Sequence, residues 1–202
     1  MIMESSRVII RTYLTLQFGN TLAASLIWGI NTLFLLDAGL SNFEAFLANA
    51  FFTLGMVLFE VPTGIVADSR GRRVSYLLGT VTLGLSTLLY YLLWMLHAPF
   101  LFWAVASLLL GPGFTFFSGA VEAWLVDALD ASDFKDKLET VFGKGQMVNG
   151  AAMLIGTLSG GAIAQLTSIG VPYILRGAIL LGLFVVAWKL MNDMGFSPDR
   201  SV

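Results

Sequence analysis

The chain has 202 residues, of which 57% are hydrophobic and only 12% are charged, with a formal net charge of −2 and a mean hydropathy of +0.82. Soluble domains carry about twice that share of charged residues, so this composition excludes an ordinary soluble protein. The balanced charge offers no basic footprint for nucleic acid. The chain has no cysteine and one histidine, His97, which excludes disulfides and metal sites built from thiolates or several histidines. We therefore expect no metal and no other cofactor.

Six apolar segments follow one another along the chain, and each reaches the roughly 18 to 20 residues that a helix needs to cross a bilayer. They cover approximately residues 13–36, 43–67, 74–96, 100–126, 146–166 and 172–190. Glycine and proline inside them are compatible with membrane helices. The sequence thus predicts an all-α membrane protein with one domain of six transmembrane helices over residues 1–195, joined by short linkers. The longest linker is a polar stretch from Asp127 to Gly145.

Basic residues are distributed unevenly between the two sides of such a bundle. All but one of the 11 lysines and arginines precede the first segment, follow the second or fourth, or lie at the end of the sixth. These positions share one side, so the positive-inside rule places both termini in the cytoplasm. The exception is Arg176, near the other end of the sixth segment. It either snorkels outward or pairs with an acid, and the sequence leaves both open.

Polar residues in the first segment share a helix face. At 3.6 residues per turn, Gln17, Asn20, Ala24 and Asn31 fall near one side. Such a face either lines a water-filled substrate path or forms hydrogen bonds between helices, which membrane bundles use routinely. The sequence supports both readings about equally.

Two acids, Glu60 and Glu122, fall inside apolar segments. An ionised carboxylate there costs several kcal/mol, so each is expected to be paired or protonated. A group in that position can carry a proton; the alternative is a structural acid bonded to backbone or to Trp124. Intramembrane acids mark function by default, so we expect at least one to handle a proton or substrate. The sequence does not decide which.

The decapeptide from Gly64 to Arg73 joins the second and third segments. Gly64 lies one turn before Asp68 and allows close helix approach, and Gly71 allows a tight turn. Asp68 sits at the negative end of the helix dipole and needs a cation, which Arg72 or Arg73 can supply.

A loop that only sets topology would explain three of these residues, the basic Arg70, Arg72 and Arg73. It would not explain Asp68 or the two glycines. Asp127, at the end of the fourth segment, is a second available acid on the same side.

The decapeptide resembles, nearly residue for residue, the signature G-x-x-x-D-x-x-G-R-R/K of the major facilitator superfamily of secondary transporters. In that family it lies between the second and third membrane helices. The resemblance implies a latch in which Asp68, Arg72 and Asp127 form a charge network with the opposite half of the transporter. That network would stabilise the outward-facing state.

A second motif lies in the fifth segment. Gly156, Gly160 and Gly161 resemble the family's antiporter motif G-P-x-x-G-G, with Thr157 in place of the proline. These glycines are expected to permit close packing and bending. The family's frequent arginine in the fourth helix is absent, so a coupling scheme based on it does not transfer.

Family members have two six-helix halves with the substrate between them. The resemblance implies that this chain is the N-terminal half, with residues 196–202 starting the central cytoplasmic loop. We expect a fragment whose C-terminal six-helix half is missing; the alternatives are a half that pairs with a separate second half or with itself. The implied function is transport of a small-molecule solute across a cell (inner or plasma) membrane by alternating access, with proton-coupled efflux as one form. The implied partners are the solute, the lipid bilayer and the second half, with no nucleic acid.

Other functions fit the sequence less well. An intramembrane serine protease needs a serine and a histidine base within reach, but Ser118 lies in a poor motif and His97 in an outer loop. A membrane phosphotransferase needs clustered intramembrane aspartates, whereas the acids from Asp127 to Glu139 fit a solvated linker. We therefore expect no enzyme activity. A membrane assembly or sensor protein that does not transport remains an alternative.

Overall fold

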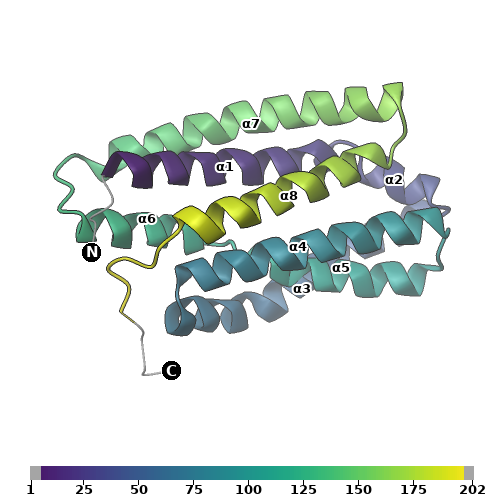
Figure 1. The fold of residues 1–202 in the computed structure, drawn as a ribbon. Coiled ribbons are helices and arrows are strands. Elements are labelled where there is room, and N and C mark those ends of the chain that lie inside the picture. The colour runs from purple at the N-terminus through teal and green to yellow at the C-terminus, as the bar shows by residue number, and fades with distance from the viewer. Residues whose placement is uncertain (1–5, 198–202) are drawn as a thin grey trace.

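The structure is a computed structural model that describes residues 6–197, and all regular secondary structure in that range is helical. The helices are α1 (Ser6–Trp28), α2 (Asn31–Asp37), α3 (Asn42–Arg70), α4 (Arg72–Met95), α5 (Phe100–Thr115), α6 (Ala120–Ala131), α7 (Leu138–Leu166) and α8 (Val171–Leu190). They form an elongated bundle in which α1 begins and α8 ends at the same end (Figure 1). The predicted all-α fold is confirmed over this range.

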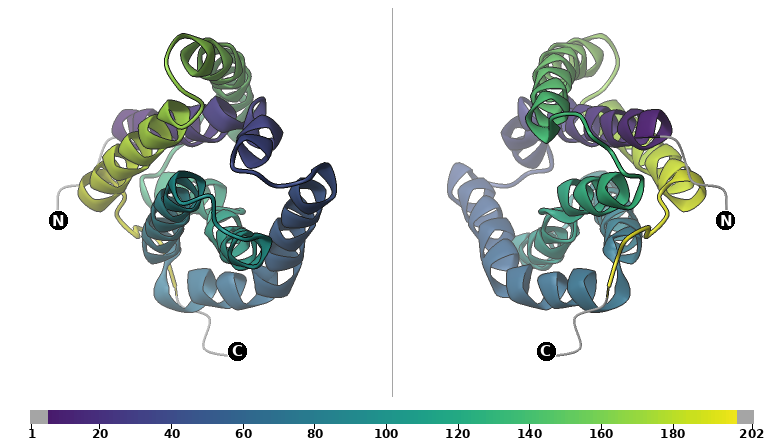
Figure 2. Two further views of the ribbon diagram at one scale, coloured as in Figure 1. Left: turned by 90° about the vertical axis from the view of Figure 1, so that its right-hand side faces the viewer. Right: turned by 90° about the vertical axis from the view of Figure 1, so that its left-hand side faces the viewer.

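Five stretches within residues 6–197 are long and apolar enough to cross a membrane: α3, α4, α5 together with α6, α7 and α8. The pair α1 and α2 meets the same criterion as one crossing bent by 46°. Each predicted apolar segment falls on one of these crossings. Seen along the bundle, α1, α7 and α8 lie together on one side and α3, α4 and α5 on the other (Figure 2).

Two of the predicted helices are broken, which the hydropathy pattern did not reveal. The first breaks at Gly29 and Ile30, between α1 and α2, and the fourth breaks at residues 116–119, between α5 and α6. Gly119 has a φ of 72°, which favours glycine and cannot continue a right-handed helix. The second break is tolerated inside the bundle because freed backbone groups find partners: the hydroxyl of Ser75 donates to the carbonyl oxygen of Phe116 at 2.9 Å.

The polar stretch predicted as a linker from Asp127 to Gly145 is mostly helical. α6 continues to Ala131 and α7 begins at Leu138, so only residues 132–137 lie outside helices. The prediction was wrong because apolar composition marks only the part of a helix that lies in hydrocarbon. The backbone hydrogen bonds of a helix can continue into water beyond that part.

Close packing of α1 on α7 depends on small residues in α7. A Cβ atom at Gly156 would lie 2.7 Å from the Cβ of Ser25, and one at Gly160 would clash with the carbonyl oxygen of Leu26. Gly161 differs, because a Cβ there would meet nothing within 4 Å. Two of the three glycines predicted to allow close packing therefore lie at this helix contact, and Gly161 lies outside it.

Two apolar clusters fill the interior. One gathers around Tyr13, Tyr76 and Trp124, and the other around Phe34 and Tyr173. In α1, the first cluster contains buried residues up to Leu16 together with Ala23, and the second contains buried residues from Leu26 onward. The polar middle of α1 therefore lies between the two clusters.

Candidate functional site

The chain turns from α3 into α4 at a single residue, Gly71, with φ 105° and ψ 154°. Only glycine adopts this conformation without strain, so the tight turn expected there is present. A Cβ at Gly64 would meet no described atom within 4 Å, so Gly64 brings no two described helices together, and its predicted role in close helix approach stays a prediction. The close approach of α3 occurs instead at Gly55, where a Cβ would clash with the carbonyl oxygen of Leu108 in α5.

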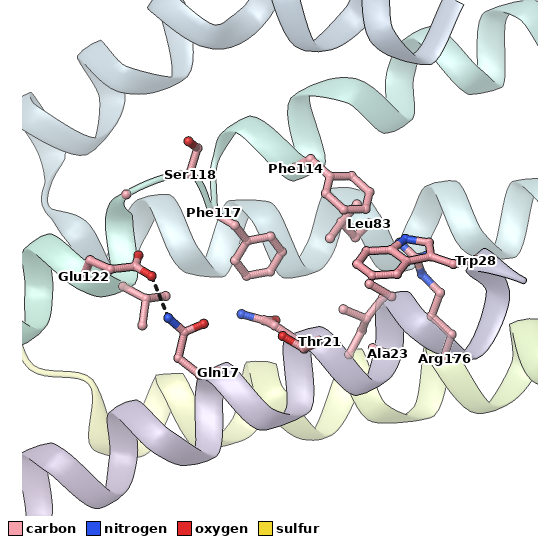
Figure 3. A pocket seen from close by; sticks show the side chains of 15 residues that line it. Gln17, Thr21, Ala23, Trp28, Leu83, Phe114, Phe117, Ser118, Glu122 and Arg176 are labelled. Atoms are coloured by element: carbon pink, nitrogen blue, oxygen red, sulfur yellow. Dashed lines mark hydrogen bonds between the residues drawn. The ribbon is translucent and has the colours of Figure 1, made fainter. Parts of the chain in front are cut away.

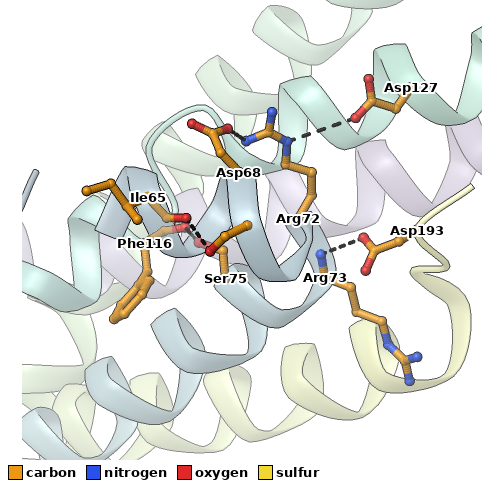
Figure 4. Close-up of polar contacts among 9 residues, drawn as sticks. Ile65, Asp68, Arg72, Arg73, Ser75, Phe116, Asp127 and Asp193 are labelled. Atoms are coloured by element: carbon orange, nitrogen blue, oxygen red, sulfur yellow. Dashed lines mark hydrogen bonds and ion pairs between the residues drawn. The ribbon is translucent and has the colours of Figure 1, made fainter. Parts of the chain in front are cut away.

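The guanidinium of Arg72 lies between two carboxylates (Figure 4). Its Nη1 donates to Oδ1 of Asp68 at 2.5 Å, and its Nε lies 3.9 Å from Oδ2 of Asp127. The three side chains are between 23% and 48% exposed, and pairs of this kind contribute about 1 kcal/mol or less. The network joins α3, α4 and α6, and it can open at a small cost in free energy.

Asp193 was missed by the sequence analysis. Its Oδ1 accepts from the backbone N–H of Arg73 at 2.9 Å, so a residue beyond α8 caps the first turn of α4 (Figure 4). The Arg73 side chain donates to the carbonyl oxygen of Trp188 at 2.5 Å, and its guanidinium lies 5.4 Å from that ring's centroid. The sequence feature that could have indicated this cap is an acidic residue shortly after the last apolar segment, on the side of the bundle where the second and third segments are joined. Arg70 is exposed and has no recorded ion pair among the described residues.

A cavity of about 300 Å³ lies in the middle of the bundle (Figure 3). Its walls come from α1, α4, α5, α6, α8 and the segment that joins α5 to α6, so the break in the fourth crossing forms part of the site. The polar residues of its wall are Gln17, Asn20, Thr21, Ser118, Glu122 and Arg176, and its larger apolar residues are Trp28, Leu83, Phe114, Phe117 and Leu180.

Gln17 and Glu122 meet at one end of this cavity. The Nε2 of Gln17 donates to Oε1 of Glu122 at 2.6 Å and to the hydroxyl of Tyr13 at 3.3 Å. The other partner considered for the acid, Trp124, instead donates its Nε1–H to the carbonyl oxygen of Asn192 at 2.7 Å. Glu122 is only partly buried, so its carboxylate is held in place yet stays within reach of the cavity.

The polar face predicted for the first segment is interrupted by the bend between α1 and α2. Asn20 lines the cavity and accepts a hydrogen bond from the hydroxyl of Tyr76 at 3.2 Å. Asn31 lies beyond the bend and outside the cavity lining. It donates to Oδ1 of Asn49 at 3.1 Å and accepts from the hydroxyl of Tyr173 at 3.0 Å. Asn20 therefore fits both readings, and Asn31 fits only the interhelical one.

The two intramembrane acids occupy different surroundings. Glu122 lines the cavity, whereas Glu60 lies on an exposed side of α3. No hydrogen bond or ion pair of the Glu60 carboxylate is recorded within the described part of the chain.

Arg176 follows neither of the two alternatives left open by the sequence. It is 2% exposed and lines the cavity, so it does not reach outward. None of the ion pairs among the described residues includes it. Its guanidinium carbon lies 5.7 Å from the ring centroid of Phe114. In the sequence, Arg176 stands out only as an exception to the charge pattern, and no local motif places it in a site.

The residues considered for a protease do not come together. Ser118 lies at the break between α5 and α6, and His97 lies before α5, which has 16 residues. A helix of that length spans about 24 Å, far beyond hydrogen-bond reach. No group of three or more histidines, aspartates and glutamates within residues 6–197 could hold a metal ion.

Bundled helices of membrane-spanning length around a polar cavity define a multi-pass membrane protein. The sequence matches the model of the Major Facilitator Superfamily over residues 13–201, and the chain belongs to this family. The resemblance predicted from the decapeptide is thereby confirmed. Comparison with curated proteins gives no match. Members of the family are transporters and not enzymes.

Proposed function

We propose that this chain is the N-terminal half of a secondary transporter that moves a small-molecule solute by alternating access. The cavity carries the proposal, because it places a carboxylate, a guanidinium and amide groups in the middle of helices that are long enough to span a bilayer. Polar groups at such depth are costly unless a solute or ion uses them.

The orientation that we propose puts the end of the bundle holding the α3–α4 turn in the cytoplasm, in an inner or plasma membrane. The basic residues at the start of α1, at this turn, around the start of α7 and at the end of α8 share that end (Figure 1). The positive-inside rule then assigns it to the cytoplasm.

A second six-helix half is the partner that we propose for the exposed side of α3. Glu60 lies there, ten residues and therefore about 15 Å from the end of α3 at Arg70. A carboxylate that far inside the hydrocarbon is unfavourable against lipid. A facing protein surface would remove this cost, and Gly64 on the same helix would allow it to approach closely.

In the mechanism that we propose, Glu122 carries the proton and Asp68, Arg72 and Asp127 form the latch at the cytoplasmic end. Glu122 is favoured over Glu60 because it lines the cavity, where a solute and a proton can influence each other. Efflux is the direction proposed, with proton entry as its driving reaction.

Alternating access can be tested without knowing the substrate. The chain has no cysteine, so each single cysteine introduced into it is the one labelling site on this half, and any cysteine of the second half is first replaced by serine. We expect Ala24→Cys, in the cavity wall, to react with a membrane-impermeant maleimide added from either side. Control cysteines replacing Gly39 and His97 should react only from outside, and those replacing Arg70 and Lys135 only from inside.

Labelling of the Ala24 position from one side only would favour a static assembly or sensor protein. Reaction of a cysteine at position 70 from outside would overturn the proposed orientation. It would not bear on alternating access, which the labelling of Ala24→Cys tests.

A further inference from the structure

Arg176 occupies a setting that its helix does not explain. It lies in the second turn of α8, on a helix whose mean composition is strongly apolar, and is 2% exposed. In Figure 3 it stands at the end of the cavity opposite Glu122. Arginine stays charged in proteins, so a full positive charge is buried in the middle of the bundle.

This charge has no anionic partner in the part of the chain that the structure describes. The recorded ion pairs join Asp68 or Asp127 to Arg72, and Asp133 to Lys135. The Nε of Arg176 is buried without any hydrogen-bond acceptor. A buried guanidinium Nε without an acceptor is unfavourable, and an anionic group in the cavity beside Arg176 would relieve this cost.

Neighbouring aromatic residues relieve this situation only in part. The ring of Phe114 lies 5.7 Å from the guanidinium, within the range of a cation–π interaction, but a ring face offers no lone pair. Tyr90 and Tyr173 are close enough to interact electrostatically with Arg176. Their hydroxyls are engaged elsewhere, with Ser107 at 2.6 Å and Asn31 at 3.0 Å.

The one acid of the cavity wall is already bound at the far end. Glu122 accepts from Gln17 at 2.6 Å, and it is not within the 4.0 Å that would make an ion pair with Arg176. The remaining wall includes three aromatic side chains, those of Phe114, Phe117 and Trp28, beside the polar Asn20 and Thr21. The wall beside Arg176 is therefore complementary to an anionic group that continues into an apolar body against Phe114 and Phe117.

We infer that the cavity binds a small organic carboxylate, whose anionic group pairs with Arg176 and whose apolar part lies against Phe114 and Phe117. A carboxylate suits the planar guanidinium because it can accept two parallel N–H bonds. A volume of about 300 Å³ lies at the lower end of ligand pockets and fits a small aromatic acid. The inference that carboxylates are the transported substrates rests on the proposed function. Binding of a carboxylate at Arg176 can be tested independently of transport.

Three probes of similar size differ in charge: the anionic benzoate, the neutral benzamide and the cationic benzylamine. Comparing them shows whether binding depends on charge. Equilibrium binding of radiolabelled benzoate to the purified intact gene product should be at least ten times tighter than that of benzamide, with no binding of benzylamine. Arg176→Gln should remove the preference for benzoate. Arg176→Lys should keep part of it, since the charge remains without the planar fork. Arg7→Gln, at an exposed arginine on α1, is the matched control and should bind as the parent does.

A second measurement locates the bound probe without changing Arg176. Benzoate should slow maleimide labelling of Ala24→Cys, and benzamide at the same concentration should not. Absence of benzoate binding, equal binding of benzoate and benzamide, or a preference that survives Arg176→Gln would each overturn the inference.

These results are distinguishable from a failure of the transport proposal. Labelling of Ala24→Cys from both sides without benzoate binding would leave a transporter for another substrate class. Benzoate binding with labelling from one side only would leave a carboxylate site in a protein that does not transport.

Discussion

Two arginines of this chain, Arg72 and Arg176, show opposite ways of placing the same side chain. At the α3–α4 turn, Arg72 stands between two carboxylates and is 23% exposed. In the cavity, Arg176 is 2% exposed and has no carboxylate partner among residues 6–197. The first arrangement is balanced within the chain, and the second requires a partner from outside it.

The difference indicates how the two regions divide their tasks. A balanced, partly hydrated network changes little in free energy when it opens, so it suits a contact that forms and breaks in each cycle. An unbalanced buried charge favours any molecule that supplies the missing anion, so it suits recognition. Three pairs of variants test this division.

The largest expected effect is on transport by Glu122→Gln. Glutamine keeps the shape and the contact with Gln17 but cannot take up and release a proton, so gradient-driven transport should fall at least tenfold while substrate exchange persists. Radiolabelled uptake with and without a pH gradient measures both. Glu60→Gln is the matched variant outside the cavity and should affect transport less. Normal gradient-driven transport in both variants would return both acids to structural roles.

A smaller effect is expected for Asp68→Asn, which weakens the balanced network while keeping side-chain size. We expect turnover to fall several-fold at unchanged expression, because the cytoplasmic end would close less firmly. Asp133→Asn is the control, since its pair with Lys135 is 82% exposed on both sides and joins no helices. Equal transport by Asp68→Asn and Asp133→Asn, at equal expression, would mean that the loop only sets topology.

The smallest effect is on stability and has opposite signs in the two regions. Arg176→Met removes a buried charge without an acceptor and should raise the free energy of unfolding of the ligand-free protein by about 1 kcal/mol or more. Arg72→Met breaks partly exposed ion pairs and should lower it by about 1 kcal/mol or less. Thermal unfolding in one detergent gives both. Should Arg176→Met prove the less stable of the two, Arg176 would hold the bundle together and not await a ligand.

What the sequence predicts well is what lies close together along the chain. Asp68, Gly71 and Arg72 fall within five residues, so one turn of backbone brings the charges together whatever the remaining helices do. Asp127 was found by counting helix ends on one side of a bilayer. The all-α fold follows from segment length and hydropathy alone.

What could not be predicted depends on how distant helices pack. The surroundings of Arg176 are formed by side chains of α1 and α5, which are distant from it in the sequence. No local sequence pattern around Arg176 could show which side chains those helices place beside it. The break at Gly119 has no hydropathy signal, because the segment stays apolar across it. Roles of the latch, of Glu122 and of Glu60 remain predictions for the experiments above.

The cap that Asp193 places on α4 has a consequence for how the protein is made. The backbone N–H of Arg73 must wait for an acceptor that is 120 residues further along the chain. At ribosomal rates of about 5–20 residues per second, that interval is roughly 6 to 24 s. During it, the pair of Asp68 and Arg72 can already form, because both residues emerge together. The first turn of α4 therefore receives its cap from Asp193 only after the last helix of the chain has been made.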